Sequence, residues 1–117
     1  SLVNFCKINK IPSICFPRGL KNNYKKFIDI VRPDAINIDQ DIDPTWARDN
    51  LTETCIQGGM DPELLLKDEK IALTEVEKYL DTFKNYPYIF NLGHGILPNT
   101  NPDIIKKIVD KVNLILR

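Results

Sequence analysis

The sequence predicts an α/β fold in which four parallel strands alternate with helices. Four short segments are mainly apolar rather than alternating, which favours strands buried on both faces, and a helical pattern follows each of them after a short connection. A complete eight-unit (β/α)8 barrel takes roughly 250 residues. The 117 residues of this chain therefore correspond to about half of such a TIM barrel, whose two end strands would have unpaired edges.

The first two strand–helix units occupy the first half of the chain. Residues 12–16 form an apolar run that suits a strand buried on both faces, and one helical stripe follows, made of Tyr24, Phe27, Ile28 and Val31. Pro33 ends that helix. Residues 35–39 are the second expected strand, and Asp43 followed by Pro44 is typical of a helix start.

The last two units follow the same order. Residues 54–57 form the third expected strand, and Asp61 and Asp68 are cap residues for two helical segments. The second of these has an apolar stripe made of Leu73, Val76, Leu80 and Phe83. Residues 88–92 form the fourth strand, and Asn101 caps a last helix whose stripe is Ile104, Ile105, Ile108, Val112 and Ile115.

Composition excludes several classes of protein. Sixteen Lys and Arg balance 16 Asp and Glu, so there is no basic surplus for nucleic acid, and no apolar run approaches the roughly 20 residues that span a bilayer. The lysine pairs 25–26 and 106–107 fall on polar helix faces. Three widely spaced cysteines, Cys6, Cys15 and Cys55, favour reduced, buried thiols and a cytoplasmic protein. Because the chain begins with Ser1 and has no leader, we expect a piece of a longer protein.

The unusual residues gather where predicted strands end. Every glycine follows such a strand, at positions 19, 58, 59, 93 and 95. The rim formed by the carboxyl ends of the strands also contains Arg18, Asp39, Gln40, Asp41 and His94. In parallel α/β folds this rim carries the ligand site. His94 is the main candidate, because a histidine between two glycines at a strand end is poorly placed to fill a core.

Other features of this rim have more than one reading. Arg18 is equally an ordinary surface charge, and the pair Gly58-Gly59 is either an anion cradle or a plain turn. Residues 39–43 imitate a calcium loop, but Pro44 and Asn50 replace the glycine and the glutamate that such a loop requires. We find no nucleophile–base motif, phosphate loop or metal pair.

Two longer segments are recognisable. Residues 56–62 (Ile-Gln-Gly-Gly-Met-Asp-Pro) precede residues 90–98 (Phe-Asn-Leu-Gly-His-Gly-Ile-Leu-Pro) and Asn101-Pro102. Together with residues 35–39, this order resembles the carboxyl-terminal third of the uroporphyrinogen decarboxylase family. The resemblance implies that residues 1–117 are the carboxyl-terminal part of a single barrel domain whose amino-terminal part is absent.

The resemblance also implies a function. Members of that family act as homodimers without a cofactor, and remove CO₂ from the four acetate side chains of uroporphyrinogen III to give coproporphyrinogen III in haem biosynthesis. His94 matches the family's substrate-binding histidine. The family's carboxylate under the pyrrole N–H groups and its substrate-binding arginines would precede Ser1, so we assign no catalytic residue here and expect this chain alone to be inactive.

Two alternatives remain open at this stage. Corrinoid-dependent methyltransferases share the barrel and use zinc held by His and Cys, although His94 stands where they tend to place a thiolate, and Cys15 has no neighbouring second ligand. A non-catalytic half-barrel that pairs with itself and binds an anionic ligand at its glycine-rich face is the other.

Overall fold

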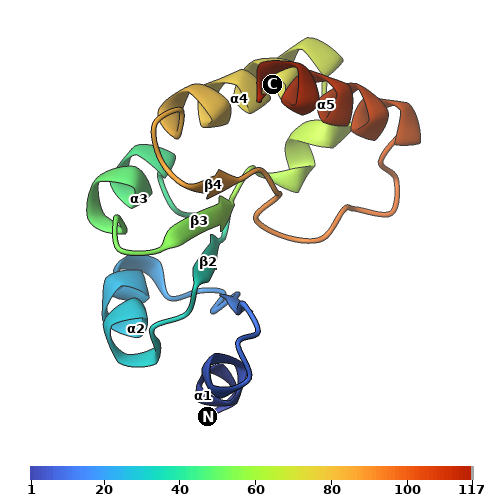
Figure 1. The fold of residues 1–117 in the computed structure, drawn as a ribbon. Helices are drawn as coiled ribbons and strands as arrows, with labels where there is room; N and C mark the ends of the chain where they lie inside the picture. The colour runs from blue at the N-terminus through green and yellow to red at the C-terminus, as the bar shows by residue number, and fades with distance from the viewer. Residues whose placement is uncertain (117) are drawn as a thin grey trace.

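A computed structural model describes residues 1–116 of the protein, and these residues form one parallel sheet with helices around it (Figure 1). The strands are β1 (Ile14–Cys15), β2 (Ala35–Ile38), β3 (Cys55–Gly58) and β4 (Tyr88–Ile89), in the spatial order β1-β2-β3-β4. The helices are α1 (Leu2–Ile8), α2 (Tyr24–Val31), α3 (Pro44–Asn50), α4 (Glu69–Thr82) and α5 (Pro102–Ile115). The fold class is confirmed: this is the arrangement of four consecutive units of a (β/α)8 barrel.

The helix starts lie where the cap residues predict them. Four side chains accept hydrogen bonds from the first free backbone N–H groups of the following turn, namely those of Asp43, Asp61, Asp68 and Asn101. Asp61 begins a 3-10 helix, η2 (Pro62–Leu66), rather than an α-helix. Helix α2 follows a short 3-10 turn, η1 (Lys21–Asn23), and ends at Val31, with Arg32 as its C-cap directly before Pro33, as expected.

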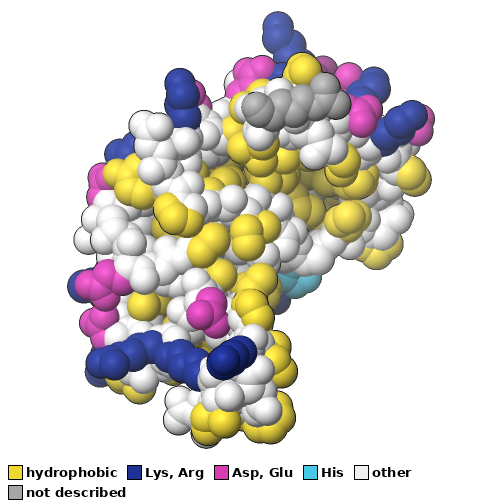
Figure 2. Space-filling model, in the orientation of Figure 1, with side chains coloured by type: hydrophobic (Ala, Val, Ile, Leu, Met, Phe, Trp, Pro, Cys, Tyr) yellow, Lys and Arg dark blue, Asp and Glu magenta, His cyan; other side chains and the backbone are white. Residues whose placement is uncertain are grey.

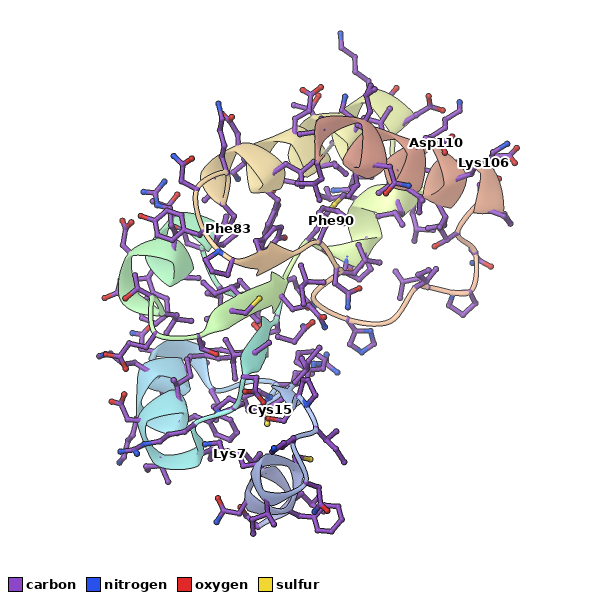
Figure 3. The ribbon with its side chains drawn as sticks, in the orientation of Figure 1. Lys7, Cys15, Phe83, Phe90, Lys106 and Asp110 are labelled. Carbon is purple, nitrogen blue, oxygen red and sulfur yellow. The ribbon has the colours of Figure 1, made fainter. Side chains whose placement is uncertain are left out.

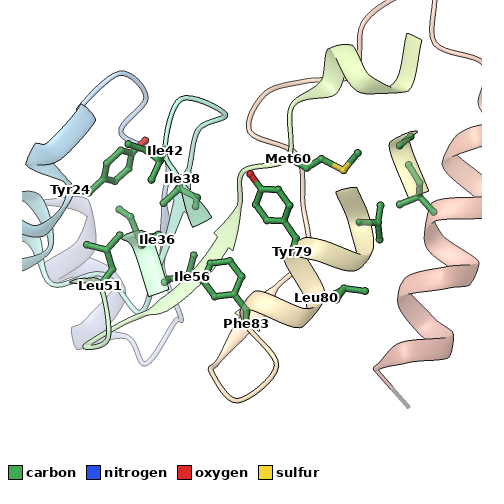
Figure 4. Packing of buried hydrophobic residues seen from close by; sticks show 14 of the residues in the cluster. Tyr24, Ile36, Ile38, Ile42, Leu51, Ile56, Met60, Tyr79, Leu80 and Phe83 are labelled. Atoms are coloured by element: carbon green, nitrogen blue, oxygen red, sulfur yellow. The ribbon is translucent and has the colours of Figure 1, made fainter. Parts of the chain in front are cut away.

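The core lies between one face of the sheet and helices α2 to α5 (Figure 4). Ile36, Ile38 and Ile56 project from this outer face and are fully buried among helix residues such as Val76 and Phe83. Side chains alternate along a strand, so the residues between these project from the opposite, inner face. No helix of the described residues covers the inner face (Figure 1).

The end strands differ from the prediction. Five residues were expected in each, but β1 and β4 are two residues long, and β1 is not buried on both faces: the side chains of Ile14 and Phe16 are 52% and 46% exposed. The reason is that β1 and β4 lie at the two edges of the sheet, where each strand has one neighbouring strand among residues 1–116. Leu92 still forms an isolated parallel bridge with Met60 beyond β4.

Several helical details also differ. Helix α1 was not predicted, and it buries Val3 while leaving Leu2, Phe5 and Ile8 exposed. The stripe of α5 is less buried than expected: Ile104 and Ile108 are buried, whereas Ile115 is 49% exposed. The two lysine pairs lie on exposed helix faces as expected, and Lys106 is visible on the outer side of α5 (Figure 3).

The three cysteines are free, as predicted, but they are half-buried rather than buried. Cys6 lies on the poorly covered helix α1, Cys15 on the edge strand β1, and Cys55 on the inner face beside Ala35. Burial raises the pKa of the Cys55 thiol, and burial followed by the nearby Cys6 raises that of Cys15. The thiols of Cys15 and Cys55 are therefore held in their less reactive protonated form.

Candidate functional site

The loops that leave β2, β3 and β4 pack against one another at the carboxyl ends of the strands. The N–H of Gly93 donates to the carbonyl of Met60 at 2.8 Å, which ties the loop after β4 to the loop after β3. A Cβ on Gly59 would lie 2.7 Å from the carbonyl oxygen of Asp39, and one on Gly93 would lie 2.8 Å from the carbonyl carbon of Asp39. The glycines at 59 and 93 are thus required by the close approach of three loops.

Gly58 is required for a further reason. Its φ of +82° lies in the left-handed region, and a Cβ there would also meet the side chain of Asn37. By contrast, a Cβ on Gly95 or on Gly19 would meet nothing within 4 Å. The predicted gathering of glycines at one rim is therefore found, and at positions 58, 59 and 93 the space beside the glycine is filled by the chain itself.

Two tyrosines, the buried Tyr79 and the half-buried Tyr88, hold the turn after β3. The hydroxyl of Tyr79 on α4 donates to the carbonyl of Gly59 at 3.0 Å, and that of Tyr88 on β4 donates to the carbonyl of Gly58 at 2.8 Å. Burial raises the pKa of both phenols well above the ordinary value, so both remain protonated donors. Sequence reasoning missed these two residues, since their partners lie 20 and 30 positions away.

Asp39 is a structural residue at this rim. Its side chain is 2% exposed, and Oδ2 accepts from the N–H of Gly19 at 2.8 Å and from the hydroxyl of Tyr24 at 2.9 Å. Oδ1 accepts from the N–H of Asp41 at 3.1 Å. The carboxylate therefore holds the loop after β1 to the end of β2. Arg18, in that loop, is exposed.

A cavity of about 450 Å³ opens on the inner face at this rim. It is lined by residues of all four strand segments: Ile14, Phe16, Asn37, Gln57, Asn91, Leu92, His94 and Gly95. Its volume lies in the range of roughly 300 to 1,000 Å³ that is usual for small-molecule sites. Of the candidates predicted at this rim, His94 and Gly95 line the cavity, whereas Arg18, Asp39, Gln40 and Asp41 do not.

His94 is partly exposed, and its ring makes one hydrogen-bond contact within residues 1–116. Its Nδ1 lies 3.2 Å from the carbonyl oxygen of Gly95, and since a carbonyl only accepts, this contact places a proton on Nδ1. Nε2 then accepts hydrogen bonds in the neutral ring and donates when the ring is doubly protonated. Pairing of Nε2 with a carboxylate therefore requires the imidazolium form.

A second cavity of about 350 Å³ lies beside the first, between the loop after β4 and helix α5. His94 borders both cavities, and the walls of the second are mostly apolar: Leu65, Phe90, Ile105, Ile108, Val109 and Val112. Phe90 rises from the chain after β4 toward α5 (Figure 3), and Figure 2 shows apolar side chains gathered in the hollow beneath this helix.

Sequence reasoning missed the amides of the first cavity. Asn37, Gln57 and Asn91 interrupt apolar segments, and that interruption was the available signal. Residues 1–116 contain no group of three or more His, Cys, Asp and Glu side chains that could hold a metal ion. None of their helices is both long and apolar enough to cross a membrane.

Comparison with known proteins places the chain in a family. Residues 2–114 match the family described as uroporphyrinogen decarboxylase (URO-D). Proteins named uroporphyrinogen decarboxylase are similar to it in Jannaschia sp. strain CCS1 (37% identity over 103 residues, 87% of this chain) and in Rickettsia felis (39% over 105 residues, 90% of this chain). In both cases the match covers 30% of the relative, so the chain spans about a third of the length of these curated relatives. The chain belongs to the uroporphyrinogen decarboxylase family.

Proposed function

We propose that the chain is the carboxyl-terminal part of a uroporphyrinogen decarboxylase. The complete protein would remove CO₂ from the four acetate side chains of uroporphyrinogen III and release coproporphyrinogen III. The observation that carries the proposal is the position of His94, which borders a cavity on the inner face of the sheet in a chain of this family. As parts of the same proposal, the complete protein needs no cofactor and acts in the cytoplasm as a homodimer.

The sheet supports the idea that residues 1–117 belong to one larger barrel domain. Within residues 1–116, β1 and β4 each have one edge without a partner strand. Ile14, Phe16 and Ile89 are exposed although they are large and apolar. Further strand–helix units that close the barrel would pair both edges and cover this inner face.

The chemistry assigns this chain a binding role. Loss of CO₂ from an acetate leaves a carbanion, which is stabilised when the pyrrole is first protonated on a ring carbon and becomes an electron sink. The groups expected to stabilise the resulting cation belong to the amino-terminal part. His94 would hold a substrate carboxylate through Nε2 in its imidazolium form, which contributes a charge-assisted hydrogen bond.

The test is decarboxylation by the complete protein, with His94→Ala and, as a matched control, Asn99→Ala in the exposed loop before α5. Loss of one hydrogen bond to a charged group costs roughly 1.5–3 kcal/mol, so kcat/KM for uroporphyrinogen should fall about 10- to 100-fold in His94→Ala and stay unchanged in the control. No coproporphyrinogen from the unmodified protein would overturn the proposed function. Unchanged kinetics in His94→Ala would make that residue merely structural.

The 117 residues alone should not decarboxylate uroporphyrinogen, because the proposal places the pyrrole-binding charged groups in the amino-terminal part. Purified chain, free of intact enzyme, is incubated with uroporphyrinogen, and the products are separated by their number of carboxylates. Coproporphyrinogen formed under these conditions would contradict this division of roles.

A further inference from the structure

The cavity on the inner face has a polar wall made of three side-chain amides. Asn37 on β2 and Gln57 on β3 are register partners in the parallel ladder, and Asn91 follows β4. Asn37 is 3% exposed and interrupts the apolar segment Ala-Ile-Asn-Ile of β2. Burial of an amide costs free energy unless its polar atoms are paired, so its partners show what the residue is for.

The hydrogen bonds fix how the amide of Gln57 is turned. The Nδ2 of Asn37 donates to the carbonyl of Ile38 at 2.9 Å, which leaves Oδ1 of Asn37 as an acceptor. That oxygen accepts from Nε2 of Gln57 at 2.7 Å. The second N–H of Gln57 has no partner among residues 1–116 and belongs to a side chain that lines the cavity. Asn37 thus acts on the cavity through Gln57.

Asn91 presents further donors. Its Oδ1 accepts from the N–H of Leu92 at 2.8 Å, which orients the amide and leaves both N–H groups of Nδ2 without a partner in the described part of the chain. His94 lies on the same wall. Of the residues that line this cavity in the described range, none is Asp, Glu, Lys or Arg, and Ile14 and Phe16 provide an apolar side.

We propose that Gln57 and Asn91 form, together with His94, a subsite for one carboxylate side chain of the substrate, and that Asn37 positions Gln57. Oriented N–H donors suit a carboxylate, which only accepts, and the apolar side suits the pyrrole ring that bears it. The subsite rests on the proposed function for the identity of its ligand. It adds two neutral binding residues and one positioning residue to the site.

Amides do not titrate, and this separates their contribution from that of histidine. A contact between Nε2 of His94 and a carboxylate, in contrast, requires the imidazolium form of the ring. The contribution of Gln57 and Asn91 is the same at every pH at which the substrate carboxylate is ionised. A pH series of KM therefore distinguishes the two kinds of contact.

The experiment uses the complete protein with Gln57→Leu, which removes the donor, and Asn91→Asp, which keeps the acceptor for Leu92 but replaces the donors by a negative charge. Asn99→Asp in the exposed loop before α5 adds the same charge outside the cavity. We expect KM for uroporphyrinogen to rise about tenfold in Gln57→Leu, the effect of losing one hydrogen bond to a charged group, and more in Asn91→Asp. The increase in Gln57→Leu should be independent of pH, because neither glutamine nor leucine titrates, and Asn99→Asp should retain the original KM.

Asn37→Ala tests the positioning role through a double-mutant cycle. If Asn37 acts only by turning the amide of Gln57, the variant with both Asn37→Ala and Gln57→Leu should have the KM of Gln57→Leu alone. Increases that multiply would overturn the positioning role. Circular dichroism shows whether each variant is folded. If Gln57→Leu does not fold, KM of Asn91→Asp still tests the subsite, because Asn91 lies in an exposed segment.

The outcomes separate the two proposals. An active protein whose KM is unchanged in Asn91→Asp and in folded Gln57→Leu would overturn the subsite and leave the proposed function standing. An unmodified protein that makes no coproporphyrinogen would overturn the proposed function, and the substrate of this subsite with it.

Discussion

Replacement of Gly93 by alanine tests the packing of the loops that place His94. A Cβ at this position would lie 2.8 Å from the carbonyl carbon of Asp39 and 3.0 Å from Cα of Gln40, and its nearest neighbour would be the backbone nitrogen of Gln40. All three atoms belong to backbone, so no side-chain rotation can relieve the contact. The loops after β2 and β4 would have to separate.

The expected cost follows from that geometry. Van der Waals contact between carbon atoms lies near 3.5–4.0 Å, so the loops must move apart by about 1 Å. Overpacking of this kind costs typically about 1–3 kcal/mol, and we expect the upper part of that range because the N–H of Gly93 also holds the carbonyl of Met60. Gly95→Ala is the matched control, since a Cβ there meets nothing within 4 Å.

The assay is urea denaturation of the complete protein, followed by circular dichroism. Gly93→Ala should lower the free energy of unfolding by about 3 kcal/mol. Gly95→Ala should change it by less than about 1 kcal/mol, because alanine there acts only by restricting the unfolded chain. Equal unfolding midpoints for the two variants would refute the close approach of the loops.

Two further changes test the supports of the site, and a third tests the opposite, amino-terminal edge of the sheet. Tyr88→Phe should make the free energy of unfolding less sensitive to pH above about 10. Burial raises the pKa of the Tyr88 phenol, so the protonated phenol stabilises the fold below its ordinary pKa, and this stabilisation is lost as pH rises. A series of denaturation experiments at alkaline pH measures the difference. Asp39→Asn should lower the free energy of unfolding by about 2–3 kcal/mol, because an NH₂ group, which only donates, replaces one of the two oxygens that accept hydrogen bonds. An unchanged midpoint in urea denaturation would argue against these hydrogen bonds of Asp39. Hydrogen bonds from the N–H and the hydroxyl of Ser13 lower the pKa of Asp34, so the ionised carboxylate stabilises the fold, and this stabilisation is lost as pH falls below about 3.8. Acid denaturation of Ser13→Ala should therefore show a smaller loss of stability in this pH range than the unmodified protein does.

The parts of the fold that depend on local chemistry could be predicted from the sequence. The caps at Asp43, Asp68 and Asn101 act on N–H groups two or three residues away, so a short segment contains all the information needed to place them. The central strand β2 could be predicted because both of its faces are buried, which leaves an apolar run.

The edges of the sheet could not be predicted in the same way. Residues 12–16 and 88–92 are as apolar as a central strand, but strand length depends on a neighbour with which to pair, and each edge has one such neighbour among residues 1–116. Helix α1 could not be predicted from a buried apolar stripe. It buries only Val3 within residues 1–116, while its other large apolar residues Leu2, Phe5 and Ile8 are exposed.

The candidate site shows the same division. His94 could be placed at the rim because it directly follows a strand segment. The pairing of Gln57 with Asn37 depends on the register between β2 and β3, and the role of Asp39 depends on Tyr24, 15 positions away. Asp39 therefore proved to be a buried support, whereas the amides of the cavity became visible in the folded chain.

The most direct test of the proposed site is a structure of the complete protein with coproporphyrinogen bound. We expect the product in the cavity on the inner face, with one of its carboxylates within hydrogen-bond distance of the His94 side chain. Product bound elsewhere in the barrel, with the His94 ring and the surrounding cavity untouched, would contradict the assignment of this rim as the substrate site.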